Sequence, residues 1–160
     1  LLGLKNCLLH ADLMITENSI FAIELSARPS GHNLHNLFTP LATGIDMAEQ
    51  YIRSQCNMDY TYEPAKTEKL LIHYFNLEQC RIKTIPQASQ LRLPQGITLK
   101  AWNCRITSGD YMQKVTTGHS LMGRGYFILQ SAPPRPSASE TTETNLINAA
   151  DHILTQFETE

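Results

Sequence analysis

The feature that most constrains this chain is an alternating apolar pattern on each side of a short polar segment near its start. In residues 8–15 (LLHADLMI) one set of side chains alternates with another: Leu9, Ala11, Leu13 and Ile15 against His10, Asp12 and Met14. Residues 16–19 (TENS) have the composition of a turn, and residues 20–25 (IFAIEL) that of a second strand. Two such segments joined so closely predict a β-hairpin.

The predicted hairpin brings two carboxylates together. If the connection consists of three residues, 17–19, then Thr16 lies opposite Ile20. In that register Asp12 lies opposite Glu24, with Cβ atoms about 5 Å apart. Two like charges at that distance are destabilising unless a cation neutralises them. A divalent cation such as Mg²⁺, which prefers hard oxygen ligands, would meet that need.

Two more polar residues follow Glu24 at strand spacing. Ser26 shares the face of Glu24 and is a candidate third oxygen ligand. Arg28, two residues further on, would direct a guanidinium toward an anion held by the metal. Simpler alternatives stay open at this point, because a two-residue turn would place Asp12 and Glu24 on opposite faces of a solvated sheet. Arg28 could also pair with Glu24 itself.

The rest of the chain predicts a helical segment and a second, strand-rich lobe. Residues 39–56 have apolar residues at helical spacing, and the capping-box spacing of Asp46 and Glu49 predicts a main helix starting near Met47. The lobe that follows contains strand-like runs at 70–75, 81–85, 97–106 and 125–130, a tight turn at 108–110 and a Pro/Ser-rich linker at 133–142. It ends in an amphipathic helix with an apolar face of Leu146, Ala150, Ile153, Leu154 and Phe157.

Composition narrows the classes of function. Of the 160 residues, 42% are hydrophobic and 18% charged, which is enough apolar content for a packed core. The net charge of −2 and the lack of a Lys/Arg run argue against nucleic-acid binding. No apolar stretch approaches the roughly 20 residues that span a membrane. Four widely spaced cysteines favour reduced thiols in a cytoplasmic protein. The opening on Leu1 resembles the middle of a protein, so we expect a fragment.

The run LGLKNCLLHADLMITENSIFAIELSARPSGHNL, with PLATGIDMAEQYI after it, resembles the C-terminal half of an ATP-grasp ligase. That family has an acidic ligand on one strand, a Glu on the next, an Arg four residues later, then a Gly-containing loop and a helix. Asp12, Glu24 and Arg28 fall on the matching positions. The stretch from Glu24 to Asn33 is similar to an E-x-x-A-R-x-x-G-x-N run of bacterial L-amino-acid ligases, and biotin-carboxylase and carbamoyl-phosphate-synthase domains are more distant relatives.

The resemblance implies an α+β fold in two parts. Residues 1–60 would belong to the C-terminal lobe of the ATP-grasp fold, an antiparallel sheet with helices that holds the metal and phosphate site. Residues 61–160 would form a small β-rich C-terminal subdomain with a closing helix. The resemblance is specific around residues 10–46 and looser beyond them.

The same resemblance implies an activity. ATP would convert a carboxylate to an acylphosphate, and an amine would then displace phosphate, as in an amino-acid or peptide ligase. The implied cofactors are ATP and Mg²⁺ or Mn²⁺, and the substrates are a small carboxylate and an amine. The implied metal ligands are Asp12, Glu24 and, as an auxiliary ligand, Ser26. Arg28 would be catalytic, and Met14, Glu24 and Arg28 would contact the nucleotide. The substrate pocket would be bordered by Ser30, Gly31, His32 and Asn33, whereas an ordinary hydrogen bond is expected of His35.

Departures from the family pattern keep alternatives open. Ser26 replaces the usual Asn, and Asp12 replaces the more frequent Glu. The Gly-rich loop and the nucleotide-binding lysines of the N-terminal half are absent, so we expect that half as a partner and expect the isolated 160 residues to be inactive. A homodimer stays open. One alternative is a degenerate ATP-grasp remnant acting as a non-catalytic binding module. Another is a biotin-carboxylase or carbamoyl-phosphate-synthase type of enzyme. A biotin carboxylase would be expected to have a Glu in the loop after Arg28, and residues 29–33 contain none.

Overall fold

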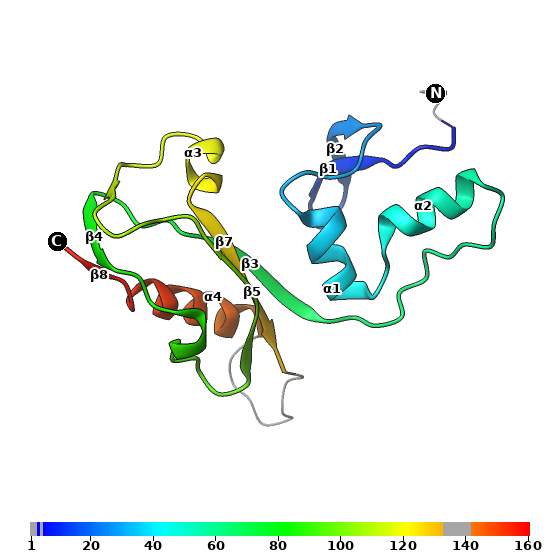
Figure 1. Ribbon diagram of the computed structural model, residues 1–160. Helices are drawn as coiled ribbons and strands as arrows, with labels where there is room; N and C mark the ends of the chain where they lie inside the picture. The colour runs from blue at the N-terminus through cyan, green and yellow to red at the C-terminus, as the bar shows by residue number, and fades with distance from the viewer. Residues whose placement is uncertain (1–2, 4, 133–141) are drawn as a thin grey trace. The chain divides into compact units, whose positions relative to one another are not determined.

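The computed structural model describes residues 3, 5–132 and 142–160 (Figure 1). Contacts within the chain divide it into two compact units, Leu1–Thr67 and Glu68–Glu160. The predicted functional domains, residues 1–60 and 61–160, stay a proposal. Most of the predicted linker at 133–142 lies outside the described residues. Within the described ranges, no helix is both long and apolar enough to cross a membrane.

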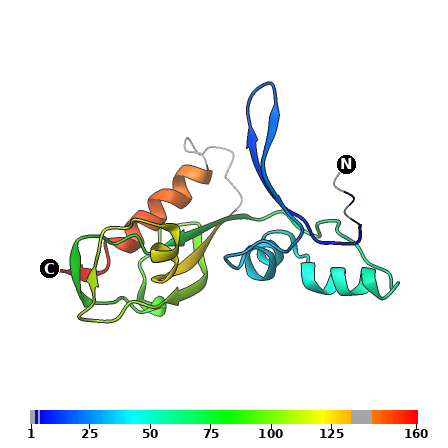
Figure 2. The ribbon, with the colours of Figure 1, turned by 90° about the horizontal axis from the view of Figure 1, so that it is seen from above.

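The first unit begins with the predicted antiparallel hairpin, formed by β1 (His10–Ile15) and β2 (Ile20–Ser26). Figure 2 shows it projecting as a long two-stranded arm beyond the helices of its own unit. The predicted connection of three residues is wrong. Ile15, not Thr16, pairs with Ile20, so residues 16–19 form the loop. Thr16 lies inside the turn because its backbone N–H and its hydroxyl both donate to the carbonyl of Ser19, at 2.9 and 3.1 Å.

Three helical elements follow the hairpin in the first unit. They are a π-helical turn, η1 (Leu34–Phe38), and the α-helices α1 (Thr39–Thr43) and α2 (Met47–Gln55). Gly44 separates α1 from α2 at φ +78°, a left-handed conformation that suits glycine. The predicted start of the main helix at Met47 is confirmed, since the Asp46 carboxylate accepts a hydrogen bond from the Glu49 backbone N–H at 3.0 Å.

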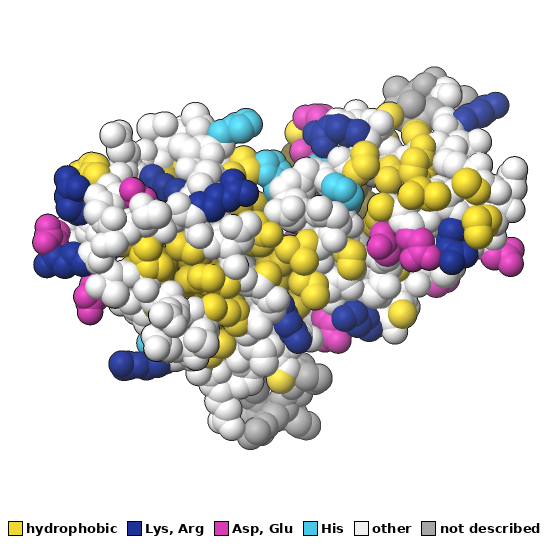
Figure 3. All heavy atoms as spheres, viewed as in Figure 1, with side chains coloured by type: hydrophobic (Ala, Val, Ile, Leu, Met, Phe, Trp, Pro, Cys, Tyr) yellow, Lys and Arg dark blue, Asp and Glu magenta, His cyan; other side chains and the backbone are white. Residues whose placement is uncertain are grey.

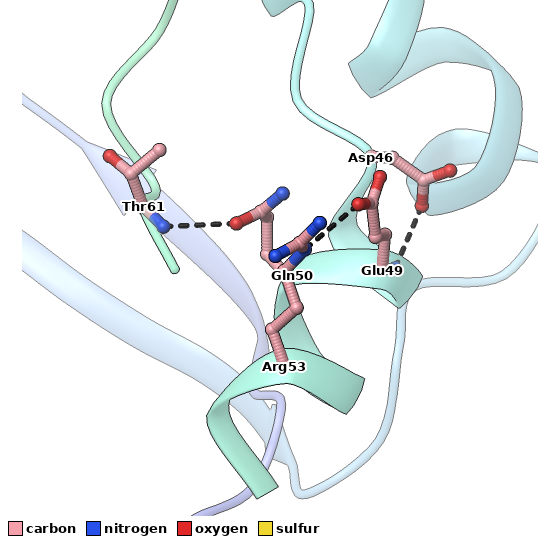
Figure 4. A network of polar contacts seen from close by, with 5 residues as sticks. All are labelled: Asp46, Glu49, Gln50, Arg53 and Thr61. Carbon is pink, nitrogen blue, oxygen red and sulfur yellow. Dashed lines mark hydrogen bonds and ion pairs between the residues drawn. The ribbon is translucent and has the colours of Figure 1, made fainter. Parts of the chain in front are cut away.

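Helix α2 also holds the segment that follows it (Figure 4). Arg53 forms an ion pair with Glu49 one turn earlier, with Nε and Oε1 2.9 Å apart. On the same helix the side-chain carbonyl of Gln50 accepts a hydrogen bond from the backbone N–H of Thr61 at 2.9 Å. The hydrogen bond of Gln50 thus ties the polar connection beyond α2 to the helix.

The second unit contains two three-stranded antiparallel sheets. One has the order β3 (Lys69–Tyr74), β7 (Gly125–Ser131), β5 (Ile97–Cys104), and the other has the order β6 (Tyr111–Met112), β4 (Cys80–Thr84), β8 (Glu158–Thr159). Helix α4 (Thr142–Leu154) packs against the first sheet, and two short elements, η2 (Ala88–Gln90) and α3 (Gly118–Met122), lie in the connections. All four predicted strands are present, whereas β6, β8 and α3 were not predicted.

The core of the second unit is aromatic at its centre. The rings of Phe75 and Phe127 are fully buried with centroids 5.3 Å apart, and Trp102 packs on both. Helix α4 covers this cluster with Leu146, Ala149, Ala150 and Ile153, close to the predicted apolar face. Gly125 has φ +94°, and a Cβ there would lie 1.8 Å from the carbonyl oxygen of Asn103, so only glycine lets β7 approach β5 at this point.

The first unit differs sharply in burial. Among its described residues only Ile45 is buried, whereas the hydrophobic core cluster lies wholly in the second unit. Large apolar side chains of the hairpin are exposed instead: Leu13 51%, Ile15 73%, Ile20 67%, Ile23 65% and Leu25 44%. Figure 3 shows hydrophobic side chains at the surface of this unit. Exposed apolar surface of this kind is typical of sites that contact another protein, a membrane or a ligand.

The exposed hairpin predicts self-association of the chain. Replacing Ile20 and Ile23 together by threonine keeps β-branched side chains in the strand but removes apolar surface, so the association constant should fall at least about tenfold. Sedimentation velocity over a range of concentrations measures this constant. The control is Tyr111→Thr, which changes an exposed strand residue of the second unit. Equal association of the double variant and the wild type would contradict the prediction.

The second unit should lose stability in mild acid because of His73. Its Nδ1 is buried without a hydrogen-bond partner in the described part of the chain, and its ring lies against Phe127. Desolvation by burial lowers the pKa of His73 below 6.5, opposed only in part by a backbone hydrogen bond at Tyr74 and by the charge of Asp151. The unfolded chain therefore takes up a proton first, and the stability present above pH 6.5 is lost as the pH falls toward the lowered pKa.

Fluorescence of Trp102 follows this unfolding directly, because Trp102 is the single tryptophan and packs in the core. His73→Phe should remove most of the loss of unfolding free energy between pH 7 and 5. His119→Gln, an exposed position, should leave it unchanged. A pH dependence that survives in His73→Phe would assign the effect to another group.

Candidate functional site

One face of the hairpin gathers the polar side chains. Asp12 pairs with Glu24, as predicted, although the predicted loop was too short. The pairing arises from a β-bulge: Leu13 pairs with Ala22 and Asp12 with Glu24, so Ile23 is an extra residue in β2. If the pairing continued from the loop without a bulge, Asp12 would lie opposite Ile23. The bulge thus corrects the register just where the carboxylates meet.

Each carboxylate contacts a polar neighbour two residues along its own strand. His10 Nε2 lies 3.1 Å from Asp12 Oδ1, and the hydroxyl of Ser26 donates to Glu24 Oε1 at 2.7 Å. His10 and Ser26 also pair directly across the strands. Four polar side chains therefore form a two-by-two group on one face, and the hydroxyl of Ser26 is already engaged with Glu24. His10 lies two residues before Asp12, so strand alternation alone places both side chains on the same face.

The donor chemistry of this group fits a cation that brings ligands of its own. Asp12 is exposed over 57% of its side chain. Within the described ranges no three His, Cys, Asp or Glu side chains are arranged to enclose a metal ion. Two carboxylates and a hydroxyl are hard oxygen donors, and Mg²⁺ commonly takes one or two carboxylates and completes its shell with water and phosphate oxygens. The group suits that mode and does not suit a closed, all-protein cage.

Met14 and Arg28 lie at opposite ends of this group. Met14 is two residues from Asp12, pairs with Phe21 and is half exposed. Arg28 lies beyond the end of β2, where its backbone N–H donates to the carbonyl of Ser26 at 2.9 Å and its Nη1 donates to the carbonyl of Pro29 at 3.0 Å. Arg28 forms no ion pair with Glu24 among the described residues, whose ion pairs lie elsewhere. The alternative in which these two residues neutralise one another is therefore not adopted.

The loop predicted to border a substrate has an unusual backbone. His32 and Asn33 are both left-handed, at φ +58° and +61°. They turn the chain into η1, whose first backbone N–H, that of Leu34, donates to the carbonyl of Gly31 at 3.0 Å. Two successive left-handed residues redirect the chain within a few residues of Arg28.

A pocket of about 300 Å³ lies beside this loop within the first unit. Ser30 lines it, but Gly31, His32 and Asn33 do not. His35 lines it as well, with its Nδ1 2.5 Å from the carbonyl oxygen of Ser30. No motif or spacing marks the other lining residues, since they come from separate segments: Cys7, Leu8, Leu9, Pro29, Thr39, Met47 and Tyr62.

The chain has part of an ATP-grasp fold, and the predicted α+β fold class is confirmed. The solved structure that it resembles is phosphoribosylglycinamide synthetase from Anaerococcus prevotii, with a TM-score of 0.66 and 15% sequence identity. The match covers 99% of this chain and 38% of that protein, so the chain spans well under half of its length. No family model matches the sequence, and no curated protein matches it.

Proposed function

We propose that this chain is the metal- and phosphate-binding portion of an ATP-dependent ligase that joins a carboxylate to an amine through an acylphosphate. One observation supports the proposal above all: a chain with part of an ATP-grasp fold pairs Asp12 with Glu24 on one face of a hairpin. Their charges are left open to solvent and to a cation, and Arg28 follows within four residues.

Each residue has a task in this proposal. Asp12 and Glu24 would hold Mg²⁺ or Mn²⁺, with Ser26 as an auxiliary ligand through its remaining lone pair. The metal, when bound, supplies positive charge that neutralises phosphate oxygens of ATP. Arg28 would bind the γ-phosphate and then the acylphosphate, since a guanidinium matches the geometry of phosphate oxygens. Met14 would contact the nucleotide base, and Ser30 to Asn33 would border the substrate.

The proposal includes the rest of the ATP-grasp domain as a partner. The resembled enzyme is more than twice as long as the matched region, since only 38% of it is covered. The exposed hairpin residues, such as Ile15 and Ile20, give that additional polypeptide an apolar surface on which to pack. A Gly-rich phosphate loop and lysines from it would grip ATP from the other side.

A non-catalytic binding module is the second candidate. The observation that favours it is the openness of the carboxylate pair, for which the described residues offer no third acidic or histidine ligand. Ser26 in place of Asn weakens the ligand set in the same direction. A full-length protein without the phosphate loop and lysines would support this second candidate.

Glu24 is the residue whose loss should matter most. In the full-length protein, Glu24→Ala should lower Mg²⁺-dependent ATP turnover, in the presence of the carboxylate and the amine, on the order of a hundredfold or more. A charge that stabilises phosphoryl transfer would be removed. The matched control is Glu17→Ala, which removes an exposed carboxylate from the loop of the same hairpin. Activity of Glu24→Ala like that of the wild type would refute the assignment.

The 160 residues alone should not turn over ATP. The phosphate loop and lysines that the family uses lie outside this sequence, so ATP would be held from one side only. Phosphate release from Mg²⁺-ATP by the purified chain, with a boiled sample as the blank, measures this. Turnover above the blank that disappears in Glu24→Ala would show that the chain is catalytically sufficient.

A further inference from the structure

The pocket beside the loop after β2 has a consistent chemistry. None of the residues that line it is acidic, and none is Lys or Arg. One wall is apolar and consists of Leu8, Leu9, Pro29 and Met47. The other polar groups that line it are hydroxyls and a thiol, with a single imidazole, His35. A ligand in this pocket would meet apolar contacts and uncharged hydrogen-bonding groups.

His35 has a defined tautomer when neutral. A carbonyl oxygen only accepts hydrogen bonds, so the contact between His35 Nδ1 and the carbonyl of Ser30 requires the proton on Nδ1. Nε2 of the neutral ring is then a hydrogen-bond acceptor. The pocket is therefore lined by a ring that can accept a hydrogen bond, in addition to its apolar residues.

This chemistry discriminates between the two substrates of the proposed ligase. A carboxylate in the pocket would find no cationic side chain and would face the lone pair of His35 Nε2, which is unfavourable for an anion. An amine in its uncharged form donates N–H groups and has no such conflict, whereas its ammonium form would pay a desolvation cost like that of the carboxylate. The position is also suitable, because Pro29 lines the pocket while its carbonyl accepts a hydrogen bond from Arg28 at 3.0 Å.

We propose that this pocket binds the amine substrate, a small primary amine with an apolar side chain, whose nitrogen donates to Nε2 of His35. The proposal rests on the proposed function for the identity of the ligand class. It assigns the substrate carboxylate to a different place, next to Arg28. The specificity for amines comes from His35, and the preference for an apolar side chain comes from the wall that contains Leu8 and Met47.

Alkylation of the cysteines tests occupancy in the unmodified chain. Cys7 lines the pocket, whereas Cys56 does not, and both thiols are exposed. Isobutylamine should slow the reaction of Cys7 with iodoacetamide, followed by peptide mass spectrometry, increasingly as the pH rises and more of the amine is uncharged, and leave the rate at Cys56 unchanged. Isovalerate, which has the same branched skeleton with a carboxylate, should protect Cys7 at least about tenfold more weakly, because it forfeits the hydrogen bond to His35. Equal protection by both probes, or none by isobutylamine, would overturn the proposal.

The variant His35→Asn removes the acceptor nitrogen Nε2 while keeping the hydrogen bond to Ser30. The amide N–H₂ of asparagine occupies the place of Nδ1 and keeps a donor for the carbonyl of Ser30, but nothing replaces Nε2. Protection of Cys7 by isobutylamine should weaken about tenfold in this variant and persist in His119→Gln, which lies in the second unit. Unaltered protection in His35→Asn would overturn the assignment of His35.

The two proposals fail in different ways. Amine binding in the pocket does not depend on Asp12, Glu24 or ATP, so protection of Cys7 is expected in Glu24→Ala as well. If Cys7 is protected by the amine while Glu24→Ala keeps full ligase activity, the catalytic assignment is wrong and the pocket stands. If Glu24→Ala is inactive and isobutylamine gives no protection, the reverse holds.

Discussion

The pairing of Asp12 with Glu24 is the interaction on which the functional interpretation of this chain depends. It is a costly arrangement by itself, because two carboxylates face one another on a two-stranded ribbon. Each acid has a polar neighbour that moderates that cost: the His10 ring lies 3.1 Å from Asp12, and the hydroxyl of Ser26 donates to Glu24. Exposure to water moderates it further. What remains is a concentration of negative charge on one face, held in register by a single extra residue in β2.

The two units divide stability and chemistry between them. The second unit has the core: Phe75, Phe127 and Ile153 are fully buried, and α4 is packed on the sheet. The first unit contains the acidic face and the pocket but buries only Ile45 among its described residues. A unit with so little internal burial gains little stability from its own apolar side chains. The proposed partner would therefore complete the folding of the first unit as well as the nucleotide site.

Local patterns in the sequence predicted the elements that local interactions determine. The hairpin follows from the alternation of apolar and polar residues. The start of α2 follows from Asp46 and Glu49, which lie only three positions apart in the sequence. The register did not follow so simply. The Thr16 turn and the bulge at Ile23 shift it in opposite senses, and composition shows neither feature.

Elements that depend on tertiary contacts were missed for physical reasons. Strands β6 and β8 contain two residues each, too few to show any periodicity, and they exist because β4 pairs with both. The turn into η1 depends on two left-handed residues, His32 and Asn33, which sequence marks only as loop formers. The pocket is assembled from segments between Cys7 and Tyr62 that no spacing rule connects.

The order of charges along the first unit separates the proposed metal site from the proposed amine site. From Glu24 through Arg28 to His35 the chemistry changes from anionic to cationic to uncharged within twelve residues. An ammonium group would be drawn to the carboxylate pair and would compete there with a metal ion. An uncharged pocket gives no such stabilisation to the ammonium form, so it favours the free amine, which is the nucleophile. Placing the amine beyond Arg28 thus separates it from the site where a cation is needed.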